Sequence, residues 1–252
     1  MKAVDLNCDL GESFGVYQLG NDQEMMKYIT SANIACGFHA GDPITMRKAV
    51  LMALNNNVSI GAHPGLPDLR GFGRRNINIS ARDAYHDVVY QIGALDAFVK
   101  SEGGVLAHVK PHGALYNLCA MDEALAEAVA EAVYRVNPLL RLYALSGSKL
   151  IKAGNKLGLV TVNEVFADRA YLDNGNLAPR DYEGSVISNN SELIEQVLQL
   201  VLQKKVTTIT GKDIPLQSDS ICLHGDTVNA VEMARLISST LKEHGVYLKS
   251  IS

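Results

Sequence analysis

The sequence predicts a (β/α) barrel with about seven parallel strands, and three observations lead to this prediction. Short apolar segments alternate with segments of helical periodicity along the whole chain. Strands that are short, mostly apolar and separated by helices are typical of a parallel sheet covered on both faces. The length of 252 residues is the usual size of one such barrel. An open doubly wound sheet is the alternative.

The elements follow one another in a regular order. Strands are predicted over residues 3–8, 31–36, 58–62, 105–109, 140–145, 158–163 and 220–223. Helices are predicted over residues 22–29, from Asp42 onward, and over 80–101, 125–136, 148–153, 191–202 and 227–244. Asp42 before Pro43, and Ser80 with Asp83, have the pattern of helix N-caps.

We expect residues 1–252 to form a single domain, because no change in composition and no internal repeat divides the chain. A small hairpin insertion is predicted near residues 206–217, where Gly211-Lys212-Asp213 separates two short segments.

The composition excludes several classes of protein. A net charge of -4 argues against a broad nucleic-acid-binding surface. No apolar run approaches the roughly 20 residues that a membrane span needs, and charged residues come too early for a signal peptide. The four cysteines are scattered, which is typical of reduced thiols in the cytosol. We therefore expect a cytoplasmic protein without nucleic-acid or membrane partners.

Polar residues gather where the predicted strands end. Lys110 and His112 flank Pro111, which fixes its own φ and stops a strand. In a barrel, the carboxyl ends of the strands meet on one face, so the residues after them share a pocket. The polar residues at or after strand ends are Asp9, Glu12, His39, Asp42, His63, Lys110, His112, Glu164, Asp168, Arg169, His224 and Asp226.

These residue types suit general acid–base chemistry on a polar substrate and stabilisation of an oxyanion. Asp9, His39 and His63 could instead bind a divalent metal that activates water. Neither H-x-x-x-H nor H-E-x-x-H spacing joins these residues, so we assign no metal site. The sequence also lacks a dinucleotide-binding G-x-G-x-x-G after the first strand and a P-loop.

Each residue also has a purely structural interpretation. Asp42 and Asp226 could serve only as helix caps, and a lone histidine at a strand end is often a structural hydrogen-bonding group. Arg74 lies in a glycine-rich loop with two further arginines, which could be solvated or could hold a carboxylate or phosphate. The coincidence of so many such residues at strand ends favours a site.

Several long motifs resemble the LamB/YcsF family. They appear in the same order as in that family, from residue 5 to near residue 245, and so cover almost the whole chain. The motifs are DLNCDLGE (residues 5–12), NIACGFHAGD (33–42), GAHP (61–64), VKPHGALYN (109–117), EVFADR (164–169) and CLHGD (222–226).

The resemblance implies one component of a hydrolase that opens the lactam of 5-oxo-L-proline (pyroglutamate) to L-glutamate, with hydrolysis of ATP to ADP and phosphate. It implies two partner subunits, B and C, and a barrel of the glycoside hydrolase and deacetylase type. ATP, with or without Mg²⁺, would be the cofactor, with no organic prosthetic group. The alternatives are a stand-alone metal-dependent deacetylase or amidohydrolase and a scaffold subunit without a catalytic role.

Under this hypothesis Lys110 and an arginine hold a phosphate or the substrate carboxylate, and a histidine acts as general base for water. The candidate catalytic residues are Asp9, His39, His63, Lys110, His112, Glu164 and His224. The candidate substrate-binding residues are Glu12, Arg74, Asp168, Arg169 and Asp226.

Overall fold

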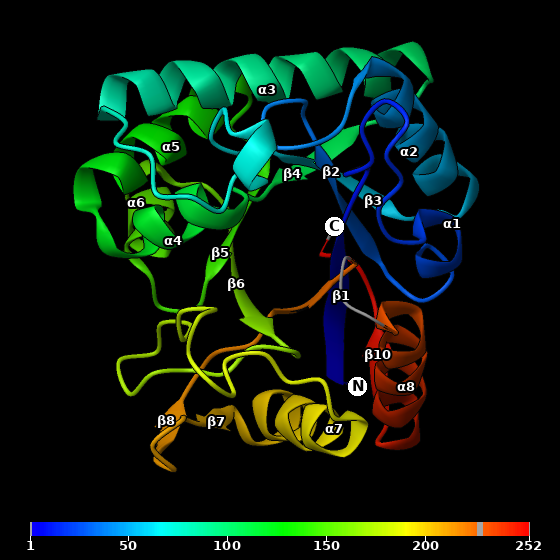
Figure 1. Ribbon diagram of the computed structural model, residues 1–252, viewed down its shortest axis with the longest axis vertical. Coiled ribbons are helices and arrows are strands. Elements are labelled where there is room, and N and C mark those ends of the chain that lie inside the picture. The colour runs from blue at the N-terminus through cyan, green and yellow to red at the C-terminus, as the bar shows by residue number, and fades with distance from the viewer. Residues whose placement is uncertain (1, 226–228, 252) are drawn as a thin grey trace.

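The computed structural model describes residues 2–225 and 229–251 and has a closed parallel barrel at its centre (Figure 1). Strand β1 pairs with β2 on one side and with β9 on the other, which closes the barrel. The predicted barrel is therefore confirmed, and an open sheet is excluded. The barrel strands, in order around it, are β1 (Lys2–Leu10), β2 (Ser31–Ala35), β3 (Ser59–His63), β4 (Leu106–Val109), β5 (Arg141–Leu145), β6 (Thr161–Phe166) and β9 (Ser220–His224).

Helices surround the barrel, and α3 runs across one side of it, packed against α5 (Figure 1). Their bounds are α1 (Asp22–Met25), α2 (Pro43–Asn55), α3 (Ala81–Ser101), α4 (Gly113–Met121), α5 (Glu123–Val136), α6 (Lys149–Leu157), α7 (Asn190–Leu198) and α8 (Ala230–Glu243). A 3-10 turn, η1 (Leu69–Gly71), lies in the loop after β3, and a π-helical turn, η2 (Gln199–Gln203), extends α7.

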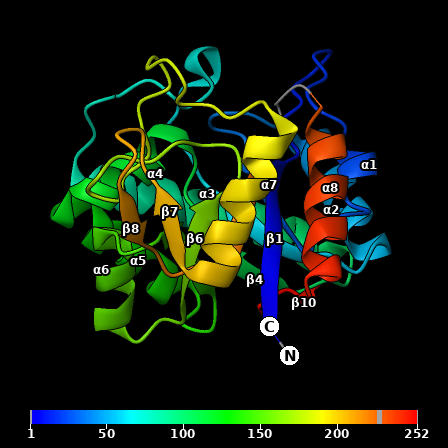
Figure 2. The ribbon, with the colours of Figure 1, turned by 90° about the horizontal axis from the view of Figure 1, so that it is seen from below.

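Within the described residues, three short strands lie outside the barrel. The antiparallel pair β7 (Lys205–Thr207) and β8 (Asp213–Pro215) forms a hairpin beside α7, where the sequence predicts an insertion (Figure 2). Strand β10 (Val246–Leu248), which was not predicted from the sequence, pairs with the first residues of β1.

Two helix starts follow the capping chemistry expected from the sequence. Asp42 Oδ1 accepts hydrogen bonds from the backbone N–H groups of Ile44 and Thr45, both at 2.9 Å, so Asp42 is the N-cap of α2. Ser80 accepts from the Asp83 N–H at 3.0 Å and donates its hydroxyl to the Asp83 carboxylate at 2.7 Å. Both predicted N-caps are confirmed.

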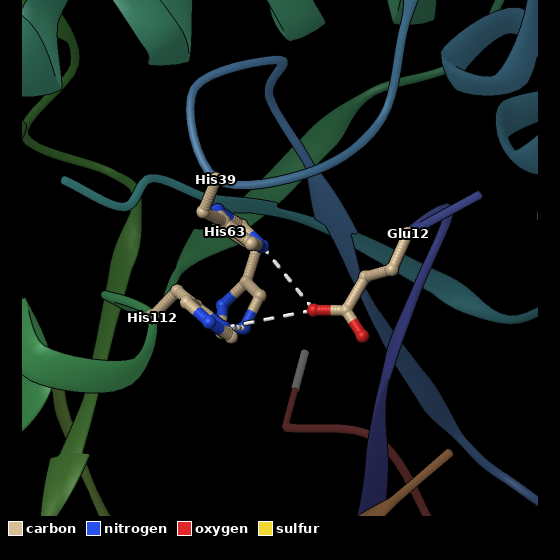
Figure 3. Close-up of side chains that lie close together, drawn as sticks. All are labelled: Glu12, His39, His63 and His112. Atoms are coloured by element: carbon tan, nitrogen blue, oxygen red, sulfur yellow. Dashed lines mark hydrogen bonds and ion pairs between the residues drawn. The ribbon is translucent and has the colours of Figure 1, made fainter. Parts of the chain in front are cut away.

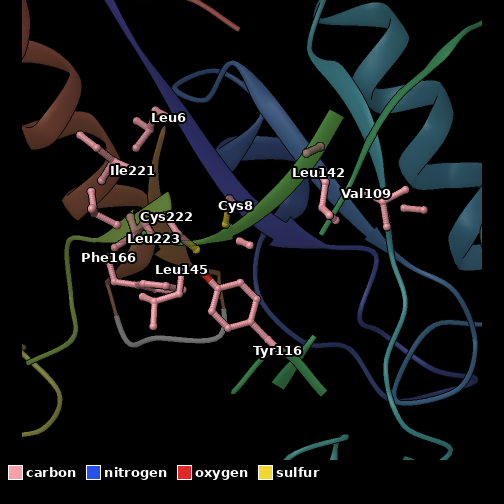
Figure 4. Close-up of a cluster of buried hydrophobic side chains, with 14 of the residues drawn as sticks. Leu6, Cys8, Val109, Tyr116, Leu142, Leu145, Phe166, Ile221, Cys222 and Leu223 are labelled. Carbon is pink, nitrogen blue, oxygen red and sulfur yellow. The ribbon is translucent and has the colours of Figure 1, made fainter. Parts of the chain in front are cut away.

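The two faces of β1 lie in different environments: one packs in the apolar core, and the other faces a polar barrel interior. Leu6 and Cys8 belong to the hydrophobic cluster that packs between strands and helices (Figure 4). Asp5, Asn7 and Asp9, at the alternate positions, bond to side chains of other barrel strands. The interior of the barrel is thus a buried polar column whose upper end carries Asp9.

The structure corrects several boundaries. The sixth strand covers Thr161–Phe166 rather than 158–163, so Glu164 lies inside the strand and not after it. Helix α4 was not predicted, and α1 is shorter than expected. The predicted start of the last helix, together with Asp226, lies outside the described residues.

All four cysteines are free and buried, as the sequence suggested. Among the helices described, none is long and apolar enough to cross a membrane.

Candidate active site

A cavity of about 540 Å³ opens at the carboxyl ends of the barrel strands. This is the end at which (β/α) barrels place their active sites. Its floor is polar and its walls include three arginines. The lining residues that bear on the chemistry are Asp9, His63, Arg74, Lys110, His112, Tyr116, Phe166, Arg169, Arg180 and His224.

Lys110, from the end of β4, is the centre of the cavity floor. Its ammonium group donates to Asp9 Oδ1 and lies against Glu164 Oε1, each at 2.9 Å. It also contacts Asn7 Oδ1 at 3.2 Å and the Cys222 sulfur at 3.0 Å. The side chain is 2% exposed, and its partners on three other strands, β1, β6 and β9, hold this cation in one position.

Both members of the Lys110–Asp9 pair are held in their charged forms. Burial alone would lower the pKa of Lys110, but Asp9, Cys222 and Glu164 raise it well above its usual value. Burial alone would raise the pKa of Asp9, but His63 and Lys110 lower it well below its usual value. The floor therefore carries a fixed ammonium next to a fixed carboxylate.

Three histidines and Glu12 form a second cluster at one side of the floor (Figure 3). His39 and His112 stack with ring centroids 3.7 Å apart, and His63 meets both rings edge-on. Glu12 Oε1 lies 3.2 Å from His39 Nε2 and 3.6 Å from His112 Nδ1. Burial lowers the pKa values of His39 and His112 well below the usual range, which favours neutral rings.

Glycines let these rings approach the backbone closely. A Cβ on Gly65 would lie 2.6 Å from His39 Nδ1, and one on Gly73 would lie 2.6 Å from the His39 Cβ. Gly73 also has a φ of +63°, which side chains rarely adopt. The glycine-rich loop after β3 therefore packs directly over the histidine cluster.

A histidine–carboxylate dyad stands on the other side of the floor. His224 Nδ1, at the end of β9, lies 2.9 Å from Asp168 Oδ2, and its ring stacks on Phe166. Burial would raise the pKa of Asp168, but the nearby His224 lowers it. Because Asp168 holds Nδ1, the Nε2 edge of the imidazole is the one available for proton transfer.

Arginines give the upper cavity a positive lining. Arg169 is fixed by donating to the carbonyls of Ser185, at 3.3 Å, and Ala178, at 2.5 Å. Burial and the neighbouring Arg180 lower its pKa to about 10, so it stays charged at neutral pH. Arg74 lies with its guanidinium 4.8 Å from the centre of the Phe72 ring. Together with Arg180, these groups favour an anionic ligand.

The structure brings most of the predicted site residues together, but not all of them reach the cavity. Asp9, His63, Arg74, Lys110, His112, Arg169 and His224 line it. The other described candidates stand behind these and contact them or their neighbours: Glu12, His39, Glu164 and Asp168.

Other polar residues of the site were not predicted from the sequence. Asn7 and Asn33 bridge Lys110, Asp9 and Glu164 inside the barrel. Polar residues at alternate positions of an apolar strand could have identified Asn7, since such positions share one face. Tyr116 and Arg180 also line the cavity, but they lie in α4, which was not predicted, and in a long loop.

A family model and individual known proteins each match this chain over nearly its whole length. Residues 4–252 match the LamB/YcsF family. A Brevibacillus brevis protein named as the A subunit of 5-oxoprolinase is 59% identical over 246 residues, covering 98% of this chain and 97% of that protein. A Bacillus subtilis (strain 168) protein of the same name is 52% identical over 252 residues, covering 100% and 98%.

Solved structures agree with the sequence relatives. The crystal structure of a lactam utilization protein from Thermus thermophilus has a TM-score of 0.93 and 45% identity, with 100% of both chains covered. A putative cellobiose-phosphate cleavage protein from Enterococcus faecalis V583 has a TM-score of 0.58 and 15% identity, with 99% and 97% covered, and shares the fold alone. The full-length family match and these relatives show that the chain belongs to the LamB/YcsF family.

Proposed function

We propose that this chain is the A subunit of an ATP-dependent 5-oxoprolinase, a cyclic amide hydrolase that opens 5-oxo-L-proline to L-glutamate together with subunits B and C. Relatives more than half identical to it are named as the A subunit of 5-oxoprolinase, and a solved relative is called a lactam utilization protein. The observation that carries the proposal is the buried Lys110 ammonium, fixed between Asp9 and Glu164 on the floor of an arginine-lined cavity.

The cavity suits the proposed substrate in charge and polarity. 5-Oxo-L-proline carries one carboxylate and one neutral lactam. We assign the carboxylate, or a phosphate attached to the lactam oxygen, to the side lined by Arg74, Arg169 and Arg180. The lactam then lies toward Lys110 and His224, which line the same cavity.

The lactam needs activation because an amide is a poor electrophile. Transfer of the terminal phosphoryl group of ATP to the lactam oxygen releases ADP and makes the adjacent carbon electrophilic. One water adds to this carbon, the C–N bond breaks with a proton going to nitrogen, and a second water releases phosphate. We assign the use of ATP to the assembly as a whole, because this chain's sequence has no P-loop.

Two groups of this chain have the geometry for the water-addition step. His224, oriented by Asp168 at 2.9 Å, would accept the proton of the attacking water. The Lys110 ammonium would stabilise negative charge that develops on oxygen, and its position needs no reorganisation during the reaction. We further propose that residues 1–252 act as a single domain in the cytoplasm.

The test is glutamate formation from 5-oxo-L-proline by the purified chain, with and without subunits B and C and with and without ATP. The proposal predicts glutamate when all three subunits and ATP are present, and none when this chain is left out. Full activity of B and C without this chain would contradict the proposal, because this chain would then have no essential role in the chemistry.

The second candidate is a stand-alone metal-dependent amidohydrolase, which the cluster of Glu12, His63 and His112 favours. It predicts hydrolysis by the isolated chain, without ATP, that a chelator abolishes. The same assay therefore separates the two functions.

A further inference from the structure

The Glu12–histidine cluster has a feature that the proposed lactam chemistry does not use. One ligand atom from each of Glu12, His39, His63 and His112 lies within 4.8 Å of the other three, and all four residues are buried (Figure 3). Three different strand ends supply Glu12, His63 and His112. Such convergence of buried imidazoles and a carboxylate needs a physical reason.

Backbone carbonyls select the neutral tautomer of two of these rings. His63 Nδ1 lies 2.7 Å from the carbonyl oxygen of Lys110, and His112 Nε2 lies 2.8 Å from that of Phe72. A carbonyl oxygen only accepts, so the proton of each neutral ring is on the nitrogen that faces it. In this neutral tautomer, the other nitrogen atoms, His63 Nε2 and His112 Nδ1, carry lone pairs.

These two lone-pair nitrogens lie 3.0 Å apart. Acceptors surround them as well, since Asp9 Oδ2 is 3.2 Å from His63 Nε2 and Glu12 Oε1 is 3.6 Å from His112 Nδ1. Acceptors gathered this closely in a buried place repel one another unless a positive species lies between them. A proton shared by the two rings would satisfy only that pair of nitrogens, whereas Glu12 Oε1 also has His39 Nε2 beside it, at 3.2 Å.

The spacing fits a small metal ion. Bonds of about 2.0–2.1 Å to a tetrahedral ion put neighbouring ligand atoms about 3.3–3.4 Å apart. The His63–His112 and His112–Glu12 separations of 3.0 and 3.6 Å lie on either side of this value. The carbonyl partners of both rings are the outer contacts that metal-bound histidines usually make.

His39 acts differently from the other two rings. It stacks on His112 with an angle of 4° between the planes, so the lone pairs of the two rings lie in separate, parallel planes. Its Nε2 is 3.2 Å from Glu12 Oε1, where an N–H would hold the carboxylate in place.

A second group with metal-ligand atoms, Asp9, Cys222 and His224, is less suitable. The Lys110 ammonium already contacts Asp9 and Cys222, at 2.9 and 3.0 Å, and would repel a metal cation there.

We propose that Glu12 Oε1, His63 Nε2 and His112 Nδ1 bind one divalent transition-metal ion of the zinc class, with His39 positioning Glu12. Two imidazoles and one carboxylate suit zinc and its neighbours better than magnesium or calcium, which prefer oxygen ligands. His63 and His112 line the cavity, so the ion has a free coordination position toward the cavity. The proposal does not depend on the lactam substrate.

Metal binding is measured on the chelator-treated, dialysed chain by titration with Co²⁺, whose visible absorption reports bound metal, followed by displacement with Zn²⁺. We expect one equivalent per wild-type chain. His63→Gln and His112→Gln should each weaken Co²⁺ binding on the order of 100-fold or more. The matched control is His244→Gln, an exposed histidine after α8, which should bind Co²⁺ like the wild type.

Thermal unfolding of the wild-type chain provides a second test, which does not depend on whether the variants fold. Excess Zn²⁺ should raise the Tm of the wild-type chain, because an ion bound only to the folded state stabilises it. A wild-type chain that takes up no stoichiometric Co²⁺ and gains no stability from Zn²⁺ would overturn the proposal. So would folded His63→Gln and His112→Gln variants that bind Co²⁺ as tightly as the wild type.

Discussion

Lys110 has both a structural and a chemical role in the barrel. Its ammonium neutralises two buried carboxylates, those of Asp9 and Glu164, and it also faces the cavity. A buried charge that loses its partner costs far more than the pair contributes, because it stays desolvated without compensation. A second substitution in this network could therefore restore the free energy of unfolding without restoring the activity.

Lys110→Met should lower the free energy of unfolding by about 3–5 kcal/mol, since it leaves two buried carboxylates without their cation. Adding Glu164→Gln to this variant removes one of those charges and should restore part of the stability. The activity should stay lost in both. Urea unfolding of the two variants and the wild type measures the effect, and equal stability of the single and double variants would contradict it.

His108 should make the fold sensitive to acid. Burial, then Lys110, His63 and Arg141, lower its pKa from 6.5 to about 3. Above pH 6.5 the ring is neutral whether the chain is folded or unfolded. As the pH falls from 6.5 toward 3, the unfolded chain binds a proton that the folded chain does not, so stability falls by about 1.4 kcal/mol per pH unit.

His108→Gln removes this linkage and keeps a donor for Asn33, to which His108 Nε2 is bonded at 2.8 Å. Urea unfolding between pH 6.5 and 5 should show a shallower loss of stability in the variant than in the wild type. Parallel pH profiles for the two proteins would show that His108 does not contribute.

At the residue scale, the sequence predicted the polar side chains near strand ends but not Asn7 and Asn33, the buried amides further inside the barrel. Lys110 and His112 could be recognised because Pro111 stops the strand between them. Glu164 was expected after its strand, but β6 runs on to Phe166 and carries it inside the barrel. An isolated sequence does not show that a cation on another strand makes such a buried carboxylate tolerable.

At the element scale, β3 and β4 can pack together because Gly61 on β3 has no side chain. Gly61 on β3 pairs with His108 on β4, and a Cβ on Gly61 would lie 2.0 Å from the His108 ring nitrogen Nε2. The imidazole therefore occupies the space that any larger residue at position 61 would need.

Gly61→Ala should destabilise the protein by several kcal/mol, on the order of the cost of overpacking a core. Gly93→Ala is the matched control, because Gly93 lies on the exposed side of α3 with nothing within 4 Å of an added Cβ. That change should stabilise the protein by about 0.5–1 kcal/mol through helix propensity. Differential scanning calorimetry of both variants checks this, and similar Tm values would contradict the account.

Helix α4 shows why one element could not be predicted. Its nine residues, Gly113–Met121, are apolar on most sides and five of them are buried, so they lack the amphipathic period that reveals a helix. Asp122 ends α4 and caps α5 through the Leu125 N–H, so no loop marks the boundary. By contrast, α3 has an apolar stripe at helical spacing and a clear cap at Ser80, and it was predicted over nearly its whole length.

At the scale of the whole molecule, the barrel divides stability and chemistry between its two ends. Asp5, at the end away from the cavity, accepts hydrogen bonds from the hydroxyls of Thr30, Ser31 and Ser220. Asp9, further along the same face of β1, lines the cavity. In barrels of this type, the end away from the active site contributes to stability.

Asp5→Ala should lower the free energy of unfolding by about 3 kcal/mol, because three buried hydroxyls lose their acceptor. The turnover of the folded enzyme in the assembly should stay close to that of the wild type. Urea unfolding together with kcat and KM per folded chain checks this, and a large loss of kcat in a folded variant would contradict it.

Closure of the barrel is also a property of the whole molecule, and the sequence did not decide between a closed barrel and an open sheet. Strand number and order could be predicted from the apolar periodicity, but the pairing of β1 with β9 joins residues more than 200 positions apart. The local sequence pattern of either strand does not indicate a contact between residues so far apart in the chain. The same limit kept the three histidines from being recognised as one cluster, since β2, β3 and β4 bring them together only in the folded barrel.

The central claim is that the chemistry of lactam opening takes place in this cavity. The most direct measurement is the rate of glutamate formation from 5-oxo-L-proline and ATP by the assembly with subunits B and C, using His224→Gln in this chain. The matched control is His86→Gln, an exposed histidine on α3.

Loss of a general base typically costs about 10²–10⁴-fold in rate, so His224→Gln should lose at least about 100-fold at unchanged Tm while His86→Gln keeps the wild-type rate. A folded His224→Gln chain that supports the wild-type rate of glutamate formation would contradict the claim.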